Sequence, residues 1–147
     1  MKIYIGADHR GFALKKHVTK ILEDLKYDIV DMGVCQKDKV CDYPLIAQKV
    51  GRSVARSKTA KGILICMSGL GQTIAANKVR GAYAALCYNA TTAKLSRLHN
   101  NANILVLAAK FVKQKDLKKI LVTWLKTEFE AGRHLRRFNQ IKKIEKG

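Results

Sequence analysis

The chain has 147 residues, enough for a single domain that buries close to ~70% of the surface of its unfolded form. It has no stretch of the ~20 mostly apolar residues that a bilayer-spanning helix needs, and its start, MKIYIGADHRG, lacks a secretory signal pattern, so we expect a soluble cytoplasmic protein. Its 29 lysines and arginines against 11 acidic residues give a net charge of +18, which would attract phosphates or nucleic acid. However, the positive residues are spread along the chain, and no RNA-binding, zinc-finger or helix-turn-helix pattern accompanies them.

In a chain of this size, the four cysteines (Cys35, Cys41, Cys66 and Cys87) predict reduced thiols in a cytosolic setting. Cys35 and Cys41 form no CxxC pair and have no histidine nearby, so we expect no metal site there.

Strand-like and helix-like segments alternate along the whole chain. Short apolar strands are expected at residues 2–7, 27–33, 62–66, 82–88 and 103–109. Helical spacing follows at 11–25, 45–57, 71–78, 91–100 and 116–129, with a terminal helix at 134–146. The helix at 91–100 is expected to begin at a threonine cap. This alternation predicts one α/β domain over residues 1–147, with a five-stranded parallel sheet covered by helices on both faces.

Reactive side chains follow the carboxyl ends of several predicted strands, where open parallel sheets bind their ligands. They are Asp8 and His9 after the first strand, Tyr43 beyond the second, Cys66 at the end of the third, and Lys110 after the fifth. We therefore expect an acid, a histidine, a thiol and a lysine to share one edge of the sheet.

Cys66 lies where a buried strand meets a glycine-rich turn, in the stretch GILICMSGLGQ. The turn opens a helix, so its backbone N–H groups should face a bound anion, although the motif is neither GxGxxG nor a Walker loop. A helix N-terminus also lowers the pKa of a thiol. A thiolate here could take a proton from carbon while the N–H groups hold the enolate oxygen. A small core cysteine at a strand end is the structural alternative.

Two further groups of residues could bind a ligand. Arg133 and Arg137 are four residues apart, a spacing that puts both guanidinium groups on one helix face, suited to a phosphate; a basic helix start explains them equally well. Among the histidines, His9 is interpreted as functional because it follows Asp8 directly, His17 and His134 as structural or surface residues, and His99 is left open.

Five motifs occur together and in order along the chain: ADHRGF, DYP, GILICxxGxG with IAANK, LSRxHNxxN, and GRHxxR. With these motifs the chain resembles the type B ribose-5-phosphate isomerases, a family that also holds allose-6-phosphate and galactose-6-phosphate isomerases. The resemblance implies interconversion of D-ribose 5-phosphate and D-ribulose 5-phosphate through a cis-enediol, in the pentose phosphate pathway, without metal or cofactor. It also implies a three-layer Rossmann-like or flavodoxin-like sandwich, and a homodimer or homotetramer with intersubunit active sites and a C-terminal helix that extends to a partner.

The resemblance also implies roles for individual residues. Cys66 is the base that moves a proton between C2 and C1, and His99 aids opening of the furanose ring. The substrate-binding residues are Asp8 and Asn100 at the sugar, Tyr43 at the pocket wall, the loop Met67, Ser68, Gly69, Leu70 and Gly71 at the enediolate oxygen, and His9, Arg133 and Arg137, together with Lys110, at the phosphate.

Some positions depart from the family pattern. Where relatives commonly have Gly-Thr-Gly, this chain has Met67, Ser68 and Gly69, and a methionine would be strained if position 67 required a positive φ. Lys110 replaces a frequent arginine and would give a point charge in place of a bidentate contact. These changes leave a hexose 6-phosphate open as the substrate. A basic nucleotide- or nucleic-acid-binding module, suggested by the charge of +18, is the alternative from another class.

Overall fold

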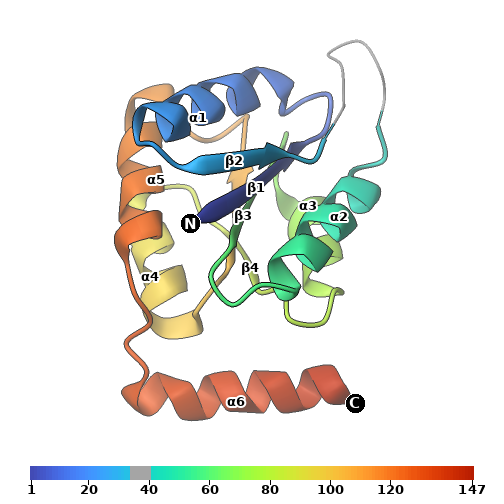
Figure 1. The fold of residues 1–147 in the computed structure, drawn as a ribbon, viewed down its shortest axis with the longest axis vertical. Coiled ribbons are helices and arrows are strands. Elements are labelled where there is room, and N and C mark those ends of the chain that lie inside the picture. The colour runs from blue at the N-terminus through green and yellow to red at the C-terminus, as the bar shows by residue number, and fades with distance from the viewer. Residues whose placement is uncertain (34–40) are drawn as a thin grey trace.

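A parallel sheet forms the centre of the computed structural model, which describes residues 1–33 and 41–147 (Figure 1). Its five strands are β1 (Lys2–Ala7), β2 (Asp28–Asp31), β3 (Lys61–Cys66), β4 (Ala84–Leu86) and β5 (Ile104–Ala108). They lie in the order β2-β1-β3-β5-β4, and every neighbouring pair is parallel. The predicted sheet is confirmed, whereas Cys35 lies outside the described residues.

Helices cover both faces of the sheet, as predicted. On one face lie α1 (Phe12–Asp24), α4 (Ala90–Asn100) and α5 (Leu117–Lys126), the last preceded by a 3₁₀ turn at Gln114–Asp116. On the other face lie α2 (Tyr43–Ala55) and α3 (Leu70–Asn77). The sixth helix, α6 (Gly132–Lys146), belongs to neither layer and is described below.

Side-chain alternation along the strands explains the two layers. In β3, Ile63 and Ile65 point into the core beneath α1 and α5, and Leu64 points into the core beneath α2. All three are fully buried, because a parallel sheet is covered on both faces. Burying each such side chain contributes about 1.5–3 kcal/mol, which is why a continuous apolar run forms a central strand.

Several predicted helix boundaries are shifted by up to three residues, and single polar contacts explain two of the differences. The cap of α4 is Asn89 rather than a threonine: its side chain accepts a 2.9 Å hydrogen bond from the backbone N–H of Thr92, and Asn caps a helix as well as Thr does. Helix α5 ends at Lys126 rather than at residue 129. The backbone of Thr127 is extended there, and its carbonyl accepts a 3.2 Å hydrogen bond from Arg97 Nε instead of continuing the helix.

Helix α6 lies apart from the two layers, beyond the amino ends of the strands (Figure 1). Ala131 and Gly132 turn the chain into it with positive φ values of 58° and 43°. The Phe138 ring packs against Tyr83 with centroids 4.8 Å apart, and a carboxylate oxygen of Glu145 accepts a 2.6 Å hydrogen bond from the Gly81 N–H. The start of β4 therefore holds α6 in place. Among the described residues, no helix is long and apolar enough to cross a bilayer.

Candidate active site

The pairing of β1 with β3 sets the relative positions of Asp8 and Cys66. Ala7 lies opposite Ile65 in the register, so the next residues along, Asp8 and Cys66, leave the sheet side by side. The chain passes from β1 to β2 on one side and reaches β3 on the other, which makes this edge the switch point where open α/β sheets bind ligands. Both side chains are buried, Asp8 to 7% exposure and Cys66 to 6%.

Backbone amides of the following turn surround the Cys66 sulfur. The Gly69 N–H donates to Sγ at 3.0 Å, and the N–H groups of Ser68 and Gln72 also face it. Gly69 has a φ of 77°, and a Cβ there would lie 2.4 Å from Leu86 Cδ1, so only glycine fits this turn. The turn therefore forms a pocket of hydrogen-bond donors at the thiol, as predicted.

The prediction of a lowered thiol pKa is wrong for this structure. Burial raises the pKa of Cys66 above its ordinary value, and the nearby Asp8 carboxylate raises it further. The N–H of Gly69 acts in the opposite direction but is outweighed by burial. The thiolate form consequently depends on pH or on positive charge brought close by a ligand or a second chain.

Asp8 is held rigidly by its own turn. Its Oδ1 accepts hydrogen bonds from the backbone N–H groups of Arg10 at 3.0 Å and Gly11 at 2.9 Å. The other carboxylate oxygen makes no hydrogen bond to the described residues, so it can accept one from a ligand hydroxyl. Next to it, Nδ1 of His9 is buried without a partner among the described residues.

The remaining members of this edge lie around the turn. Met67 does not have a positive φ, so the strain considered for it does not arise; Arg10 Nη1 lies 3.1 Å from its Sδ. The Lys110 N–H donates to the Met67 carbonyl at 3.1 Å. The Tyr43 ring lies against Gly71, where an added Cβ would be 2.5 Å from Tyr43 Cζ. The carboxyl-edge group therefore consists of Asp8, His9, Tyr43, Cys66, the loop 67–71 and Lys110.

The other predicted site residues, His99, Asn100, Arg133 and Arg137, form a second group, the helix-end group. His99 and Asn100 are the last two residues of α4, and the two arginines lie in the first two turns of α6. The His99 ring stacks on the ring of His134, with centroids 4.1 Å apart and planes 10° from parallel. Asn100, Arg133 and Arg137 are exposed.

The two groups lie at opposite edges of the sheet. Helix α4 begins beside the carboxyl end of β4 and runs back to the start of β5. Its 11 residues span roughly 16 Å at 1.5 Å per residue, and His99 lies at the far end. Figure 1 shows α6 at the same far edge. One chain therefore does not bring Cys66 and His99 together.

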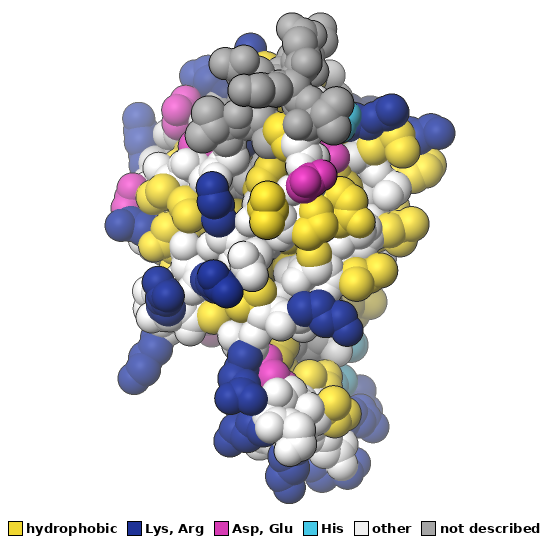
Figure 2. All heavy atoms as spheres, turned by 90° about the vertical axis from the view of Figure 1, so that its right-hand side faces the viewer, with side chains coloured by type: hydrophobic (Ala, Val, Ile, Leu, Met, Phe, Trp, Pro, Cys, Tyr) yellow, Lys and Arg dark blue, Asp and Glu magenta, His cyan; other side chains and the backbone are white. Residues whose placement is uncertain are grey.

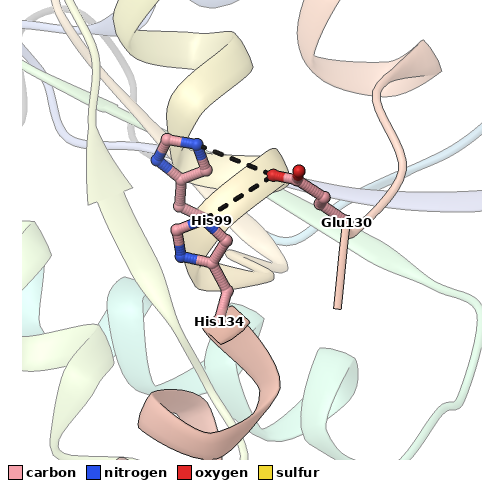
Figure 3. Close-up of side chains that lie close together, drawn as sticks. All are labelled: His99, Glu130 and His134. Carbon is pink, nitrogen blue, oxygen red and sulfur yellow. Dashed lines mark ion pairs between the residues drawn. The ribbon is translucent and has the colours of Figure 1, made fainter. Parts of the chain in front are cut away.

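The described residues include one cluster with metal-ligand atoms: His99, Glu130 and His134, whose ligand atoms lie within 4.8 Å of one another (Figure 3). The two imidazoles are nearly parallel, so their in-plane lone pairs run side by side and do not converge on one point. The cluster is better described as two rings that share one carboxylate than as a metal centre.

The cysteines follow the prediction only in part. Cys66 and Cys87 are free, whereas Cys41 is disulfide-bonded, so the expectation of reduced thiols is wrong for Cys41. Spacing along the chain does not reveal how closely two sulfurs approach in the fold, and it is this distance that decides whether they bond.

Sequence reasoning missed three residues near the two groups: Glu130, His134 and Gln72. Glu130 lies four residues before His134 and close to His99, but a single acidic residue between two predicted helices gives no signal in the sequence. His134 was interpreted as structural or surface; it is indeed buried, yet it contacts the predicted catalytic His99. The side-chain nitrogen and oxygen of Gln72 are buried with no partner among the described residues.

Comparisons with known proteins give one consistent result. The model of the Ribose/Galactose Isomerase family matches residues 3–141. A probable ribose-5-phosphate isomerase B of Mycoplasma genitalium is 43% identical over 148 residues, covering 98% of this chain and 95% of that protein. The ribose-5-phosphate isomerase B of Escherichia coli K12 is 38% identical over 144 residues, covering 98% of this chain and 96% of that protein.

Solved structures agree with this result. The crystal structure of ribose-5-phosphate isomerase B from Mycoplasma genitalium with bound ribulose-5-phosphate has a TM-score of 0.94 and is 42% identical, covering 99% of this chain and 96% of that one. The resemblance drawn from the five sequence motifs is thereby confirmed, and the chain belongs to the ribose/galactose isomerase family.

Proposed function

We propose that this protein interconverts D-ribose 5-phosphate and D-ribulose 5-phosphate, with Cys66 as the base. The observation that carries the proposal is the Cys66 sulfur at the ligand-binding edge of the sheet, 3.0 Å from the Gly69 N–H and beside Asp8. An aldose–ketose isomerisation needs a base next to donors that can hold an enediolate oxygen. Further support comes from the structural relative that was solved with ribulose-5-phosphate.

The proposed reaction moves one proton between two carbons. The Cys66 thiolate takes the proton from C2, and the electron pair of that bond forms the enediolate, whose negative oxygen accepts hydrogen bonds from the backbone N–H groups of the loop 67–71. The thiol then returns a proton to C1, while the hydroxyl proton on the C2 oxygen passes to the C1 oxygen, which gives the ketose. Asp8 accepts hydrogen bonds from sugar hydroxyls. The route uses no metal or cofactor.

A complete site requires two subunits in this proposal, because the carboxyl-edge group and the helix-end group are separated within one chain. His99 and Asn100 of the partner subunit would reach the sugar, with its α6 extending across the interface. An exposed apolar surface supports this assembly: Leu45, Leu70 and Ile74 on α2 and α3 are 58–63% exposed. Figure 2 shows hydrophobic side chains gathered on this face of the molecule. A homodimer is the smallest assembly that supplies both groups.

The phosphate would be held by positive groups from both subunits. His9 and Lys110 lie at the carboxyl edge, and His9 Nδ1 is buried without a partner among the described residues. Arg133 and Arg137 of the partner subunit would supply charge-assisted hydrogen bonds. Their positive charge near Cys66 would also favour the thiolate, offsetting the effect of burial. Because sugar phosphates are charged and do not cross membranes freely, the proposed location is the cytoplasm, in the pentose phosphate pathway.

A direct assay tests this function. The purified protein should convert ribose 5-phosphate into ribulose 5-phosphate without added metal. The absorbance of the ketose measures the rate of this conversion. Binding to RNA or DNA should be measured alongside at several salt concentrations, because the charge of +18 alone would give weak, salt-sensitive binding. Strong nucleic-acid binding without turnover would reject the isomerase and favour the binding module.

A hexose 6-phosphate is a second candidate substrate, and Met67 is the observation that favours it. Its side chain is 38% exposed at the turn beside Cys66 and contacts Arg10, so it can alter the space available to the sugar. Turnover of ribose, allose and galactose phosphates should be compared in the wild type and in Met67→Gly. A higher kcat/KM for a hexose phosphate in the wild type would replace the pentose as the preferred substrate.

A further inference from the structure

Glu130 lies between two histidines that come from different helices. Its Oε2 is 3.9 Å from Nε2 of His99, on α4, and 3.6 Å from Nε2 of His134, on α6 (Figure 3). Glu130 itself belongs to neither helix but to the segment 127–131 that joins α5 to α6. Three separate elements therefore bring these side chains together.

The backbone fixes the position of this carboxylate relative to His99. The Glu130 N–H donates a 3.0 Å hydrogen bond to the carbonyl of Leu98, the residue immediately before His99. Leu98 is in the last turn of α4, where carbonyls have no partner within the helix and need one from elsewhere. The segment is thus tied to the same helical turn that carries His99.

His134 is held in its neutral form. Arg133 Nε–H donates to His134 Nε2 at 3.4 Å, so that nitrogen acts as an acceptor. Burial lowers the pKa of His134, and the positive charges of His99, Arg133 and Arg137 lower it further, against a smaller opposing effect of Glu130. A neutral, buried ring stacked at 4.1 Å fixes the plane of His99 without competing for the charge of the carboxylate.

The charged groups around His99 come from the segment 127–131 and from α6. Glu130 is the anion next to it, and Arg133, whose Nε lies 3.4 Å from His134 Nε2, is a cation on the first turn of α6. We propose that Glu130 and His134 are positioning residues for His99: the carboxylate next to its Nε2 and the stacked ring hold the imidazole in the orientation that opening of the sugar ring needs.

The step that these residues would support is balanced in protons. The His99 ring gives a proton to the ring oxygen of the furanose, the bond from that oxygen to C1 breaks, and its electron pair stays on the oxygen. The C1 hydroxyl then loses its proton to the same imidazole, which leaves an open-chain aldehyde and restores the protonation of His99. Because this deepens the role proposed for His99, it rests on the proposed function.

The test separates ring opening from proton transfer at carbon. Ribulose 5-phosphate has no free hydroxyl at C5, so it forms no furanose ring. Exchange of its C1 hydrogen for deuterium in D2O therefore needs only the thiol and the amide pocket, and NMR measures the rate of this exchange. Glu130→Gln keeps the size of the side chain and removes its charge. Glu128→Gln is the matched control, because Glu128 lies on the same segment and is exposed.

We expect Glu130→Gln to lose roughly 10-fold or more of ribose 5-phosphate isomerisation, part of the ~10²–10⁴-fold that general acid catalysis supplies, while C1 exchange stays within about twofold. His134→Asn should lower isomerisation with C1 exchange likewise retained.

Either of two results would overturn the inference: equal loss of isomerisation and exchange in Glu130→Gln, or an isomerisation rate in Glu130→Gln that matches the rate of Glu128→Gln. Failure of the proposed function looks different, because the wild type would then show neither isomerisation nor exchange. Cys66→Ala provides the reference for that outcome, since it should lose both rates together.

Discussion

The carboxyl-edge group and the helix-end group are built in opposite ways. Cys66 and Asp8 are buried, follow directly from paired strands and are held by backbone N–H groups. Arg133 and Arg137 are exposed long side chains on a helix that packs outside the two layers. A proton transfer at carbon tolerates little error in distance, whereas a phosphate can be held by flexible cations. We infer from this difference that the carboxyl-edge group carries out the proton transfer at carbon, whereas the helix-end group captures the substrate and opens its ring.

The largest expected effect comes from removing the base of the carboxyl-edge group. Cys66→Ala should lower kcat by about 10²–10⁴-fold or more, the range typical for a positioned proton-transfer group. The measurement is ribose 5-phosphate turnover by the purified variant, with circular dichroism to show that the fold is kept. Cys87→Ala is the matched control: Cys87 is also free and buried, but lies in the core after β4. If both variants kept full turnover, the thiol would have no catalytic role.

The second effect concerns the separation of the groups. Cys66→Ala and His99→Asn should each be nearly inactive alone, but a mixture allowed to exchange subunits should recover activity. In a dimer with two intersubunit sites, a hybrid contains one site with both wild-type residues, so an equal mixture should reach roughly a quarter of the wild-type rate. Turnover before and after subunit exchange provides the measurement. A mixture that remained inactive while hybrids formed would place both residues in a single chain's site.

The third effect concerns capture of the phosphate by the helix-end group. Arg137→Ala should raise the KM for ribose 5-phosphate about 10-fold to 100-fold, because a hydrogen bond to a charged group contributes about 1.5–3 kcal/mol. Arg136→Ala removes the same charge from an adjacent exposed position and should change the KM little. Steady-state kinetics with both variants at fixed ionic strength makes the comparison. Similar KM values for the two would mean that only the overall positive charge matters.

The smallest effect is a pH shift within the carboxyl-edge group. The Asp8 carboxylate raises the pKa of Cys66, so Asp8→Asn should lower that pKa, and the thiolate should form at lower pH. The rate of alkylation by iodoacetamide, measured from pH 6 to 10, reports the thiolate directly. Glu23→Gln, an exposed change on α1, should leave the alkylation profile as it is in the wild type. A shift to higher pH in Asp8→Asn would contradict the assigned cause.

Local patterns predicted the elements well where burial decides them. The continuous apolar run before Cys66 became β3, and the strand ends placed Asp8, Cys66 and Lys110 on one edge because parallel strands share a direction. Boundaries failed where a single polar contact decides: the Asn89 cap and the bond from Arg97 to Thr127 depend on individual side chains.

The sequence by itself determined the alternation of strands and helices, the edge that carries the thiol, and the family, since all of these depend on residue type and order along the chain. Only the tertiary structure decided that the thiol pKa is raised, because burial and the neighbouring Asp8 arise from packing. It also decided that His99 lies with Glu130 and His134, and not with Cys66. The reason is geometric: a helix between two parallel strands returns the chain to the opposite edge of the sheet, so residues at its two ends lie a full helix length apart.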